Sequence, residues 1–286
     1  MDSNSKQIII EREFEFTQND FNFLRKIVNE RTGIVVADEK IDMFYSRLAR
    51  RIRYLGLSDF KQYCERIKNE DDGSEVDQLI NAITTNLTSF FRESYHFEYL
   101  SNILVPELIN AQPDKRKLKI WSAGCSSGEE PYSIATTLHH LGLATDGWDI
   151  EILATDIDSN VLGHGMNGIY SLEQLGTVPE QYLQSGFLRG KGASFGKVRV
   201  KPDVKSMVEF AYLNLNSPWT LPEPVDIVFC RNVIIYFDKE SKKKLVSRIA
   251  DNLNPGGYLF IGHSESLFRV SDQFELVGKT IYRKKS

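Results

Sequence analysis

Residues 117–135 have the sequence KLKIWSAGCSSGEEPYSIA. The run at 118–122 predicts a strand, and the glycines that follow, Gly124 and Gly128, let the backbone turn sharply and approach a ligand closely. Pro131 suits a first helical turn, because its missing N–H costs nothing there. This stretch therefore predicts a strand, a tight loop and a helix, with a ligand bound at the loop.

Strand-like runs alternate with helical segments over the chain after Pro113. The runs lie at 118–122, 150–155, 208–213, 226–230, 258–262, 274–277 and 280–283. Such alternation predicts parallel βαβ units and a doubly wound, Rossmann-like α/β sheet. Only Gly278 and Lys279 separate the last two runs, so these form either an antiparallel pair or one bent strand.

The chain before this region, from about Thr17 to Leu104, predicts helices only. The expected helices begin at Thr17 and end at Gly33, cover about 38–55, run from the cap Ser58 to about 69, and cover 75–84. We therefore expect a helical domain at 1–88 and a second domain at 89–286. Residues 168–203, with their Gly-rich loop, predict a small insertion in the second domain, part helix and part hairpin.

The composition excludes several classes of protein. The chain has 286 residues, a net charge of −4 and 26% charged residues, typical of a soluble protein. No apolar run approaches the roughly 20 residues of a membrane span, and the polar N-terminus does not resemble a signal peptide. The three cysteines are scattered and the histidines lack ligand spacing, so we expect a reducing, cytoplasmic location and no metal site. The acidic balance argues against a nucleic-acid partner.

The loop at 124–128 discriminates between two nucleoside ligands. A dinucleotide fold uses G-x-G-x-x-G and places a pyrophosphate over the helix N-terminus. Here the loop is G-x-x-x-G, followed by Glu129 and Glu130, whose carboxylates would repel two phosphates. S-Adenosylmethionine carries an ammonium and a sulfonium, which suit these acids, and Asp156 after the second strand is placed to accept from its ribose. The alternative stays open that the glutamates only favour the helix N-terminus.

Three further segments carry a family resemblance. They are TTNLTSFFR at 84–92, FCRNVIIYF at 229–237 and GHSES at 262–266. With residues 122–133 they resemble the chemotaxis-receptor glutamate O-methyltransferases of the CheR type, in the same order from about Phe21 to Tyr282. The resemblance implies a class I methyltransferase sheet, an inserted β-subdomain, and S-adenosylmethionine as cofactor with S-adenosylhomocysteine as its product.

The resemblance also implies roles for single residues. Asn86, Thr88 and Arg92 would form a segment that closes over the cofactor. Glu130 would hold the methionine ammonium and Asp156 the ribose. Asn214 and Leu215 would border the adenine, Arg231 and Asn232 would line the pocket, and Tyr236 would lie near the reacting groups.

The acceptor that the resemblance implies is a glutamate carboxylate. With an ordinary pKa of about 4.3 it is already an anion at neutral pH, so attack on the sulfonium methyl needs no general base. It needs in-line placement, for which Arg92 and Tyr236 are candidates as cation and hydroxyl donor. Enzymes similar to the base-amine methyltransferases carry an Asn/Asp-Pro-Pro-aromatic loop where this chain has residues 230–232, which argues against a nucleic-acid amine. Another acceptor, or a module that binds the cofactor without catalysis, are the alternatives.

Arginines in the second expected helix form a candidate partner surface. They are Arg47, Arg50, Arg51 and Arg53, of which the first three share a face. Such charges often only solvate a helix; the functional interpretation is an electrostatic dock for an acidic partner. An RNA or lipid surface would also fit a basic helix. The resemblance implies the cytoplasmic helical domain of a chemoreceptor and, in some family members, a receptor C-terminal peptide that adds a strand to the β-subdomain. Nothing suggests an obligate assembly, so we expect a monomer.

Overall fold

The computed structural model describes residues 12–111 and 116–285. Its contacts divide the chain into two compact units, Met1–Thr84 and Thr85–Ser286. The boundary expected from the sequence lies close by, after residue 88. None of the described helices is long and apolar enough to cross a membrane.

The first unit is helical, as the sequence predicts. It contains α1 (Gln18–Thr32), η1 (Asp38–Lys40), α2 (Ile41–Tyr54), α3 (Phe60–Lys68) and α4 (Ser74–Ile83). Thr17 caps α1 in a reciprocal box with Asp20, and Gly33 ends the helix with φ of 74°. The buried rings of Phe21 and Phe44 meet edge to face, 5.2 Å apart, in the core of this unit.

The cap of α3 differs from the prediction. Asp59, rather than Ser58, accepts from the backbone N–H of Gln62, at 2.8 Å. The Ser58 hydroxyl instead accepts from the Gln62 side chain at 2.6 Å. Both residues are good caps, and the choice between them depends on backbone geometry that a single sequence does not reveal.

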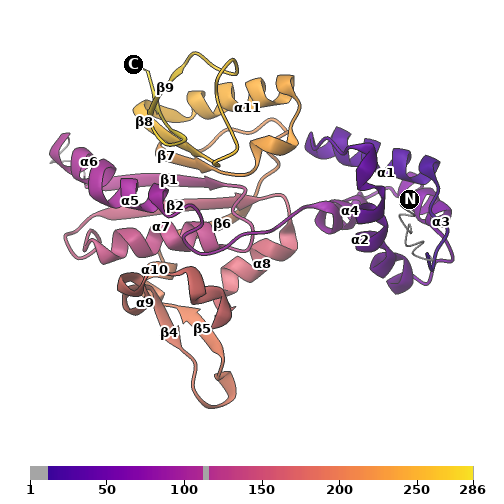
Figure 1. Cartoon of the computed structure of the whole chain (residues 1–286), viewed down its shortest axis with the longest axis horizontal. Coiled ribbons are helices and arrows are strands. Elements are labelled where there is room, and N and C mark those ends of the chain that lie inside the picture. Colours follow the sequence, from indigo (N-terminus) through magenta and orange to yellow (C-terminus); the bar gives the residue numbers. More distant parts are fainter. Residues whose placement is uncertain (1–11, 112–115, 286) are drawn as a thin grey trace, which may run out of the picture. The chain divides into compact units, whose positions relative to one another are not determined.

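The second unit is built on a seven-stranded sheet (Figure 1). Its strands are β1 (Lys117–Ala123), β2 (Asp149–Asp156), β6 (Val208–Tyr212), β7 (Val225–Cys230), β8 (Leu253–Ile261), β9 (Phe274–Gly278) and β10 (Ile281–Lys284), in the order β6-β2-β1-β7-β8-β10-β9. The pairs β6–β2, β2–β1, β1–β7 and β7–β8 are parallel, and β10 is antiparallel to β8 and β9. The Rossmann-like class I methyltransferase sheet is therefore confirmed, and the last two runs are an antiparallel pair.

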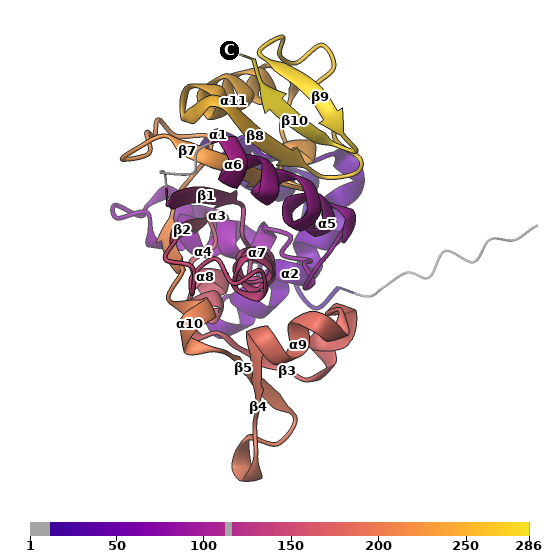
Figure 2. The ribbon, with the colours of Figure 1, turned by 90° about the vertical axis from the view of Figure 1, so that its left-hand side faces the viewer.

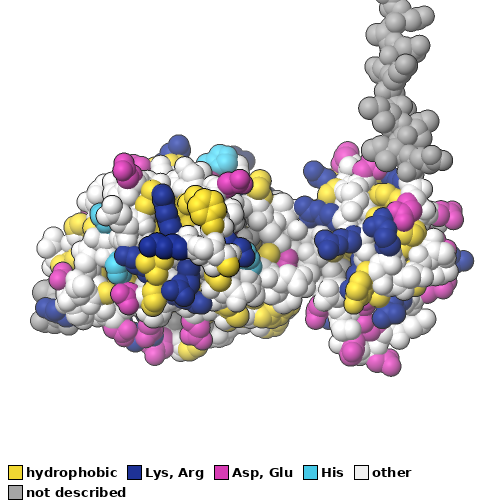
Figure 3. All heavy atoms as spheres, turned by 90° about the horizontal axis from the view of Figure 1, so that it is seen from below, with side chains coloured by type: hydrophobic (Ala, Val, Ile, Leu, Met, Phe, Trp, Pro, Cys, Tyr) yellow, Lys and Arg dark blue, Asp and Glu magenta, His cyan; other side chains and the backbone are white. Residues whose placement is uncertain are grey.

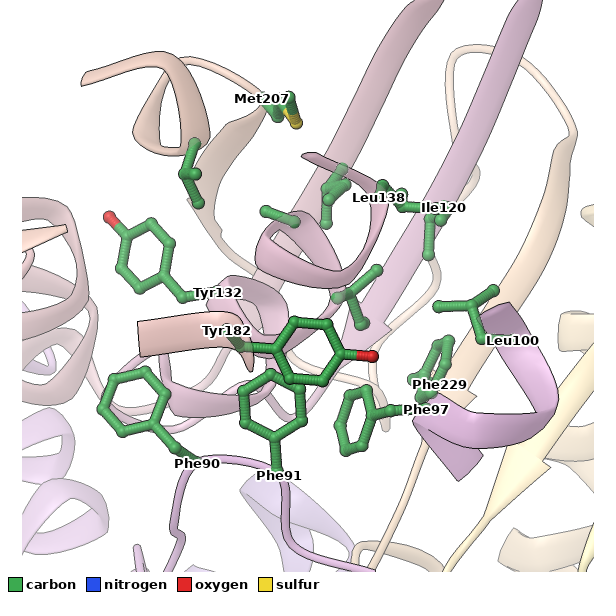
Figure 4. Close-up of a cluster of buried hydrophobic side chains, with 14 of the residues drawn as sticks. Phe90, Phe91, Phe97, Leu100, Ile120, Tyr132, Leu138, Tyr182, Met207 and Phe229 are labelled. Atoms are coloured by element: carbon green, nitrogen blue, oxygen red, sulfur yellow. The ribbon is translucent and has the colours of Figure 1, made fainter. Parts of the chain in front are cut away.

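Alternate residues of the central strands face different layers of helices, so Ile120 packs in one apolar cluster and Trp121 in the other. The first cluster includes residues of α5 (Tyr95–Tyr99), η2 (Leu100–Leu104) and α7 (Glu129–His140), and the second includes residues of α11 (Lys239–Asp251). Two further helices, α6 (Val105–Ala111) and α8 (Ser159–Asn167), complete the layers (Figure 1). In the first cluster the Phe97 and Phe229 rings are stacked 6.2 Å apart (Figure 4).

A smaller antiparallel sheet is inserted after α8 (Figure 2). Its strands are β3 (Ile169–Ser171), β4 (Phe187–Arg189) and β5 (Lys197–Val200), with β5 between β3 and β4. The chain between these strands forms η3 (Glu173–Thr177), α9 (Glu180–Gly186) and η4 (Gly192–Ser194), and α10 (Pro202–Lys205) follows the sheet. Gly186 lets this subdomain approach α7, because a Cβ there would lie 2.7 Å from Thr136. The predicted combination of helix and hairpin is confirmed.

The segment between α4 and α5 departs from the helical prediction. Residues 84–94 form no α-helix. Within this segment Phe91 and Glu93 adopt the left-handed conformation, with φ of 52° and 58°. Non-glycine residues take this conformation uncommonly, so other parts of the unit must hold the segment in place.

Candidate functional site

The loop after β1 lies tightly against the end of β2. The N–H groups of Gly124 and Cys125 both donate to the Thr155 carbonyl, at 2.8 and 2.9 Å. Gly124 has φ of 80°, and a Cβ there would overlap the Val233 side chain. Both the backbone conformation and the lack of space therefore require glycine at this position.

Asp156 is buried at the carboxyl end of β2. Its Oδ2 accepts from the Ser126 N–H at 2.8 Å, and its Oδ1 accepts from the Asp158 N–H at 3.0 Å. Burial raises the pKa of Asp156, although these N–H groups oppose the rise. A carboxylate has about four acceptor positions, so it has capacity left for ribose hydroxyls.

Asn86 reaches the same loop from the segment before α5. Its side-chain amide donates to the Asp158 carboxylate at 2.7 Å, and its backbone carbonyl accepts from the Ser126 hydroxyl at 3.0 Å. Thr88 is half-buried in this segment. The structure thus brings Asn86 and Asp156 together around Ser126.

The two glutamates at the start of α7 have different partners. The buried Glu129 accepts from the Ser127 hydroxyl at 2.7 Å and from the Gln174 amide of the inserted subdomain at 3.2 Å. Glu130 accepts from the Ser122 hydroxyl at 2.7 Å and from Arg231 Nη1 at 3.0 Å. Burial raises the pKa of Glu130, and the Arg231 charge opposes the rise. Glu129 therefore ties the loop to the insertion, whereas Glu130 belongs to a cluster of charges.

Arg231 follows β7, and its side chain is only 2% exposed. In addition to Glu130, it contacts the Arg92 carbonyl, to which Nη2 donates, and the Glu93 carboxylate, which lies 3.3 Å away. Its Nε has no hydrogen-bond partner among the residues that the structure describes. A buried donor left unpaired costs about 1–3 kcal/mol, so this position suits a ligand that brings an acceptor.

The turn that leads from Arg231 to Tyr236 is fixed by a buried carboxylate. Glu265 accepts from the N–H groups of Gly262 at 2.5 Å, Asn232 at 2.9 Å and Ile235 at 3.2 Å. Burial raises the pKa of Glu265 in spite of these donors. Asn232 takes φ of 58° in this turn, and Tyr236 is half-buried in η5 (Ile234–Tyr236).

The other predicted site residues of this unit lie at the ends of the same elements. Asn214 and Leu215 follow β6, where the Leu213 N–H donates to the Asp156 carbonyl at 3.0 Å. The candidates for the adenine therefore lie beside the candidate for the ribose. The Arg92 guanidinium donates to the Leu87 carbonyl at 2.9 Å in exposed surroundings.

Most of the α2 arginines have partners within the helical unit. Arg51 forms two hydrogen bonds with the Glu75 carboxylate, at 2.8 and 2.7 Å, and the Glu75 side chain is 2% exposed. Arg53 pairs with Glu13, and Arg47 donates to the Thr84 carbonyl at 2.9 Å. Arg50 is exposed. The predicted basic face is therefore less available than its sequence indicates, and Arg51 in particular neutralises a buried acid.

Sequence reasoning does not single out Glu93 or His263, both of which lie in the cluster around Arg231. The His263 ring Nδ1 is 2.8 Å from the Glu93 carboxylate. The only signal in the sequence is position, because Glu93 directly follows the motif at 84–92 and His263 lies within the motif at 262–266. Their contact joins residues far apart in the chain, which no local pattern predicts.

Comparison with known families matches both units. Residues 19–84 match the family described as "CheR methyltransferase, all-alpha domain", and residues 86–283 match "CheR methyltransferase, SAM binding domain". The chain is 41% identical to the chemotaxis protein methyltransferase of Salmonella typhimurium, over 98% of this chain and 96% of the relative. It is 42% identical to that of Escherichia coli, over 92% and 89%, and 34% identical to that of Borreliella burgdorferi, over 98% and 99%.

S-Adenosylmethionine is the cofactor of the second unit. The charged cluster fits its amino-acid end, because the Glu130 carboxylate suits an ammonium and the unpaired Arg231 Nε–H suits a carboxylate. Both domain matches lie in chain order and the relatives align over nearly the whole length. The chain belongs to the CheR methyltransferase family.

Proposed function

We propose that this protein transfers a methyl group from S-adenosylmethionine to glutamate side chains of bacterial chemoreceptors, forming methyl esters in chemotaxis adaptation. The names of its relatives, which this chain covers almost completely, support a role in chemotaxis. The observation that carries the proposal is the bond from Arg231 to the Arg92 carbonyl, because Arg231 also binds Glu130. This bond holds the backbone of Arg92, whose guanidinium suits an acceptor carboxylate, to a residue of the charged cluster.

The cofactor supplies an electrophilic methyl group on a sulfonium. Glu130 would hold the ammonium, Asp156 the ribose hydroxyls, and Asn214 and Leu215 the adenine. Asn86, Thr88 and Arg92 would close the segment at 84–92 over the cofactor. Arg231 and Asn232 would line the pocket from the end of β7.

The acceptor carboxylate forms a bond to the methyl carbon while the carbon–sulfur bond breaks and its electron pair returns to sulfur. No proton moves, because the acceptor is already an anion at neutral pH. Arg92 and Tyr236 would orient that anion for in-line attack, as a cation and a hydroxyl donor. Their contact must stay loose, since a strongly stabilised carboxylate is a poorer nucleophile.

Receptor recognition would use surfaces of both units. On α2, the exposed Arg50 is the best candidate for an acidic receptor helix. Arg51 and Arg53 already have acidic partners, and Arg47 donates to the Thr84 carbonyl. Figure 3 shows basic side chains gathered on the face of the larger unit that carries the insertion. The exposed bases of the insertion itself include Arg189, Lys191, Lys197 and Arg199.

The insertion would bind a receptor C-terminal peptide by strand addition. Its central strand is β5, which leaves one edge of β3 and one edge of β4 without a strand partner in the described sheet. The side chain of Phe195 in the nearby hairpin is exposed, as a contact for an apolar peptide residue would be. One chain has both surfaces, so a monomer is sufficient.

The test is to incubate the protein with methyl-labelled S-adenosylmethionine and chemoreceptor membranes, and then to treat the labelled receptors with base. Carboxyl methyl esters release volatile methanol, whereas N-methyl products do not. We expect base-labile label on the receptors, and none on receptors whose methylated glutamates are replaced by alanine. Base-stable label would indicate another acceptor, and cofactor binding without any label would indicate a regulatory module; either result would overturn the proposal.

A further inference from the structure

Glu93, the residue after Arg92, has a carboxylate that separate segments of the second unit approach. Its Oε1 accepts from His263, from the backbone N–H at 3.2 Å and from ring Nδ1 at 2.8 Å. Its Oε2 accepts from the Tyr95 hydroxyl at 3.1 Å and lies 3.3 Å from Arg231 Nη2. The side chain is 9% exposed, so these contacts are strengthened by the exclusion of water.

Arg231 connects Glu93 to the cofactor site. One end of its guanidinium lies against Glu93 and the Arg92 carbonyl, and the other end lies 3.0 Å from Glu130. Because the guanidinium is planar and rigid, displacement of one end displaces the other. The position of Glu93 therefore affects both the Glu130 carboxylate and the backbone that carries Arg92.

The backbone around Arg92 is held at several points. Left-handed residues flank it on both sides, Phe91 and Glu93. The Phe91 N–H donates to the Ser133 hydroxyl at 2.9 Å, and the Phe90 carbonyl accepts from the Thr177 hydroxyl at 2.7 Å. Such strained conformations persist only where their surroundings determine them, and Glu93 supplies the contacts on its side of Arg92.

The charges around Glu93 have a simple arrangement. His96 Nδ1 lies 3.7 Å from the Glu93 carboxylate, but burial lowers the pKa of His96 to about 3, so that ring is neutral at physiological pH. The cation between the carboxylates of Glu93 and Glu130 is the buried Arg231. The cluster has an excess of negative charge, which suits a cationic ligand.

We propose that Glu93 is a positioning residue for methyl transfer: it holds Arg231 against Glu130 and so fixes the Arg92 segment beside the cofactor. This inference rests on the proposed roles of Glu130 and Arg92. A carboxylate accepts hydrogen bonds on both oxygens, toward His263 and toward Arg231. An amide presents a donor to one of these partners whichever way it turns, so Glu93→Gln breaks one side of the link with almost no change in shape.

The experiment compares Glu93→Gln, Glu93→Asp and His263→Ala with the control Glu98→Gln. Glu98 is an exposed acid on α5, so its variant loses the same charge outside the cluster. Calorimetry measures the Kd for S-adenosylhomocysteine, and label transfer to receptor membranes measures kcat and KM. We expect Glu93→Gln to raise Kd by about tenfold through the lost charge-assisted bond, and to lower kcat by on the order of a hundredfold through misplacement of the Arg92 segment.

Glu93→Asp keeps the charge, and aspartate tolerates the left-handed conformation. We therefore expect it to recover most of the cofactor affinity and only part of kcat, because its shorter side chain cannot reach both His263 and Arg231. His263→Ala, at an exposed side chain, keeps the fold and should lower kcat with a smaller effect on Kd.

A Glu93→Gln protein that behaves like Glu98→Gln would overturn the inference. Equal impairment of Glu93→Asp and Glu93→Gln would also overturn it. The same holds if the losses of cofactor affinity and of kcat merely follow the fraction of unfolded protein. The binding measurement needs no acceptor. If the unaltered protein binds the cofactor product but labels no receptor, the proposed function fails while the effect of Glu93 on binding is still measured.

Discussion

At the scale of single residues, Arg92 has a backbone that Arg231 holds and a side chain that donates to the Leu87 carbonyl. Its guanidinium lies in exposed surroundings, so its removal should leave the fold intact. We expect Arg92→Ala to change the Kd for S-adenosylhomocysteine by less than about threefold and to lower kcat by on the order of a hundredfold, as loss of one orienting charge does. Arg92→Lys keeps the cation and should lose less activity. Equal losses in binding and turnover would mean that Arg92 serves the cofactor instead of the acceptor.

Gly124 combines a left-handed backbone with an absence of space. We expect Gly124→Ala to destabilise the second unit by roughly 2 kcal/mol or more, because the new Cβ meets Val233 and the backbone has φ of 80°. Cofactor affinity should fall as well, since the displaced loop carries Ser126, which binds Asp156. Gly163 in α8 is the control: nothing lies within 4 Å of its Cβ position, so Gly163→Ala should be neutral or stabilising by up to about 1 kcal/mol. Similar destabilisation by both changes would contradict this account.

Residue roles were predictable where one position alone determines them. The need for glycine at position 124 follows from the geometry of the turn. The role of Asp156 follows from its position after a strand, because the carboxyl ends of parallel strands meet at one edge of the sheet. The role of Glu93 was not predictable, because its partners His263 and Arg231 come from loops after β8 and β7. Arg51 shows the converse: its spacing predicts a docking face, but tertiary contact pairs it with the buried Glu75.

At the scale of elements, the inserted subdomain supports the segment that carries Arg92. The Thr177 hydroxyl of η3 donates to the Phe90 carbonyl, and Tyr182 of α9 stacks on Phe91 with ring centroids 4.7 Å apart (Figure 4). We expect Thr177→Val to destabilise the second unit by about 1 kcal/mol through the unpaired carbonyl. It should also lower kcat by roughly threefold or more, because the segment loses a fixed point.

Thr145→Val is the matched control for this prediction. The Thr145 hydroxyl makes a local bond to the Gly142 carbonyl in an exposed turn. Loss of that bond should therefore affect stability slightly and kcat not at all. If Thr177→Val keeps full kcat while its stability falls, the insertion supports the fold of the segment without affecting its catalytic placement.

The regular elements were predictable because their patterns are local. The periodic apolar positions of α1 and the apolar run of β1 determine what each segment buries, and the structure agrees with both. The segment at 84–94 was predicted within a helical region and is irregular, because its conformation depends on Ser133, Thr177 and Arg231 rather than on its own sequence. The beginning of β8 at Leu253 was also missed, since Pro255, Gly256 and Gly257 argue against a strand and the pairing there is interrupted by an irregularity.

At the scale of the whole molecule, stability in acid should depend on Glu93. Burial would raise the pKa of Glu93, but the His263 hydrogen bonds and the Arg231 charge outweigh it and lower this pKa from 4.5 to about 2; Tyr95 also donates to Glu93, and His96 and Glu130 lie nearby. A carboxyl pKa that is lower in the folded than in the unfolded state stabilises the fold at pH values above the unfolded-state pKa. This contribution disappears as the pH falls toward 2. It amounts to about 3 kcal/mol at pH 7 and roughly 1 kcal/mol at pH 3.

The difference in unfolding free energy between the unaltered protein and Glu93→Gln should therefore shrink as the pH falls from 7 to 3. Denaturant titrations followed by tryptophan fluorescence measure it, because Trp121, Trp148 and Trp219 all lie in the second unit and report its unfolding alone. Acids with raised pKa values, such as Glu265, affect both proteins alike and cancel in the difference. A difference that is constant with pH would show that the Glu93 carboxylate has no specific ion pairing in the folded state.

The helical unit and the cofactor unit should contribute separately to receptor methylation. We expect Arg50→Glu to raise the KM for receptor membranes by about tenfold and to make this KM less dependent on salt concentration. The Kd for S-adenosylhomocysteine should stay unchanged. Lys61→Glu is the control, because Lys61 is an exposed base on α3 and the change in net charge is the same. Arg51→Glu is unsuitable for this test, since it would replace the nearer cation of the buried Glu75 by a second carboxylate and leave only Arg66, 3.6 Å away. We expect such a change to destabilise the unit by about 3 kcal/mol or more. If Arg50→Glu and Lys61→Glu raise KM equally, long-range charge rather than a docking face on α2 accounts for receptor binding.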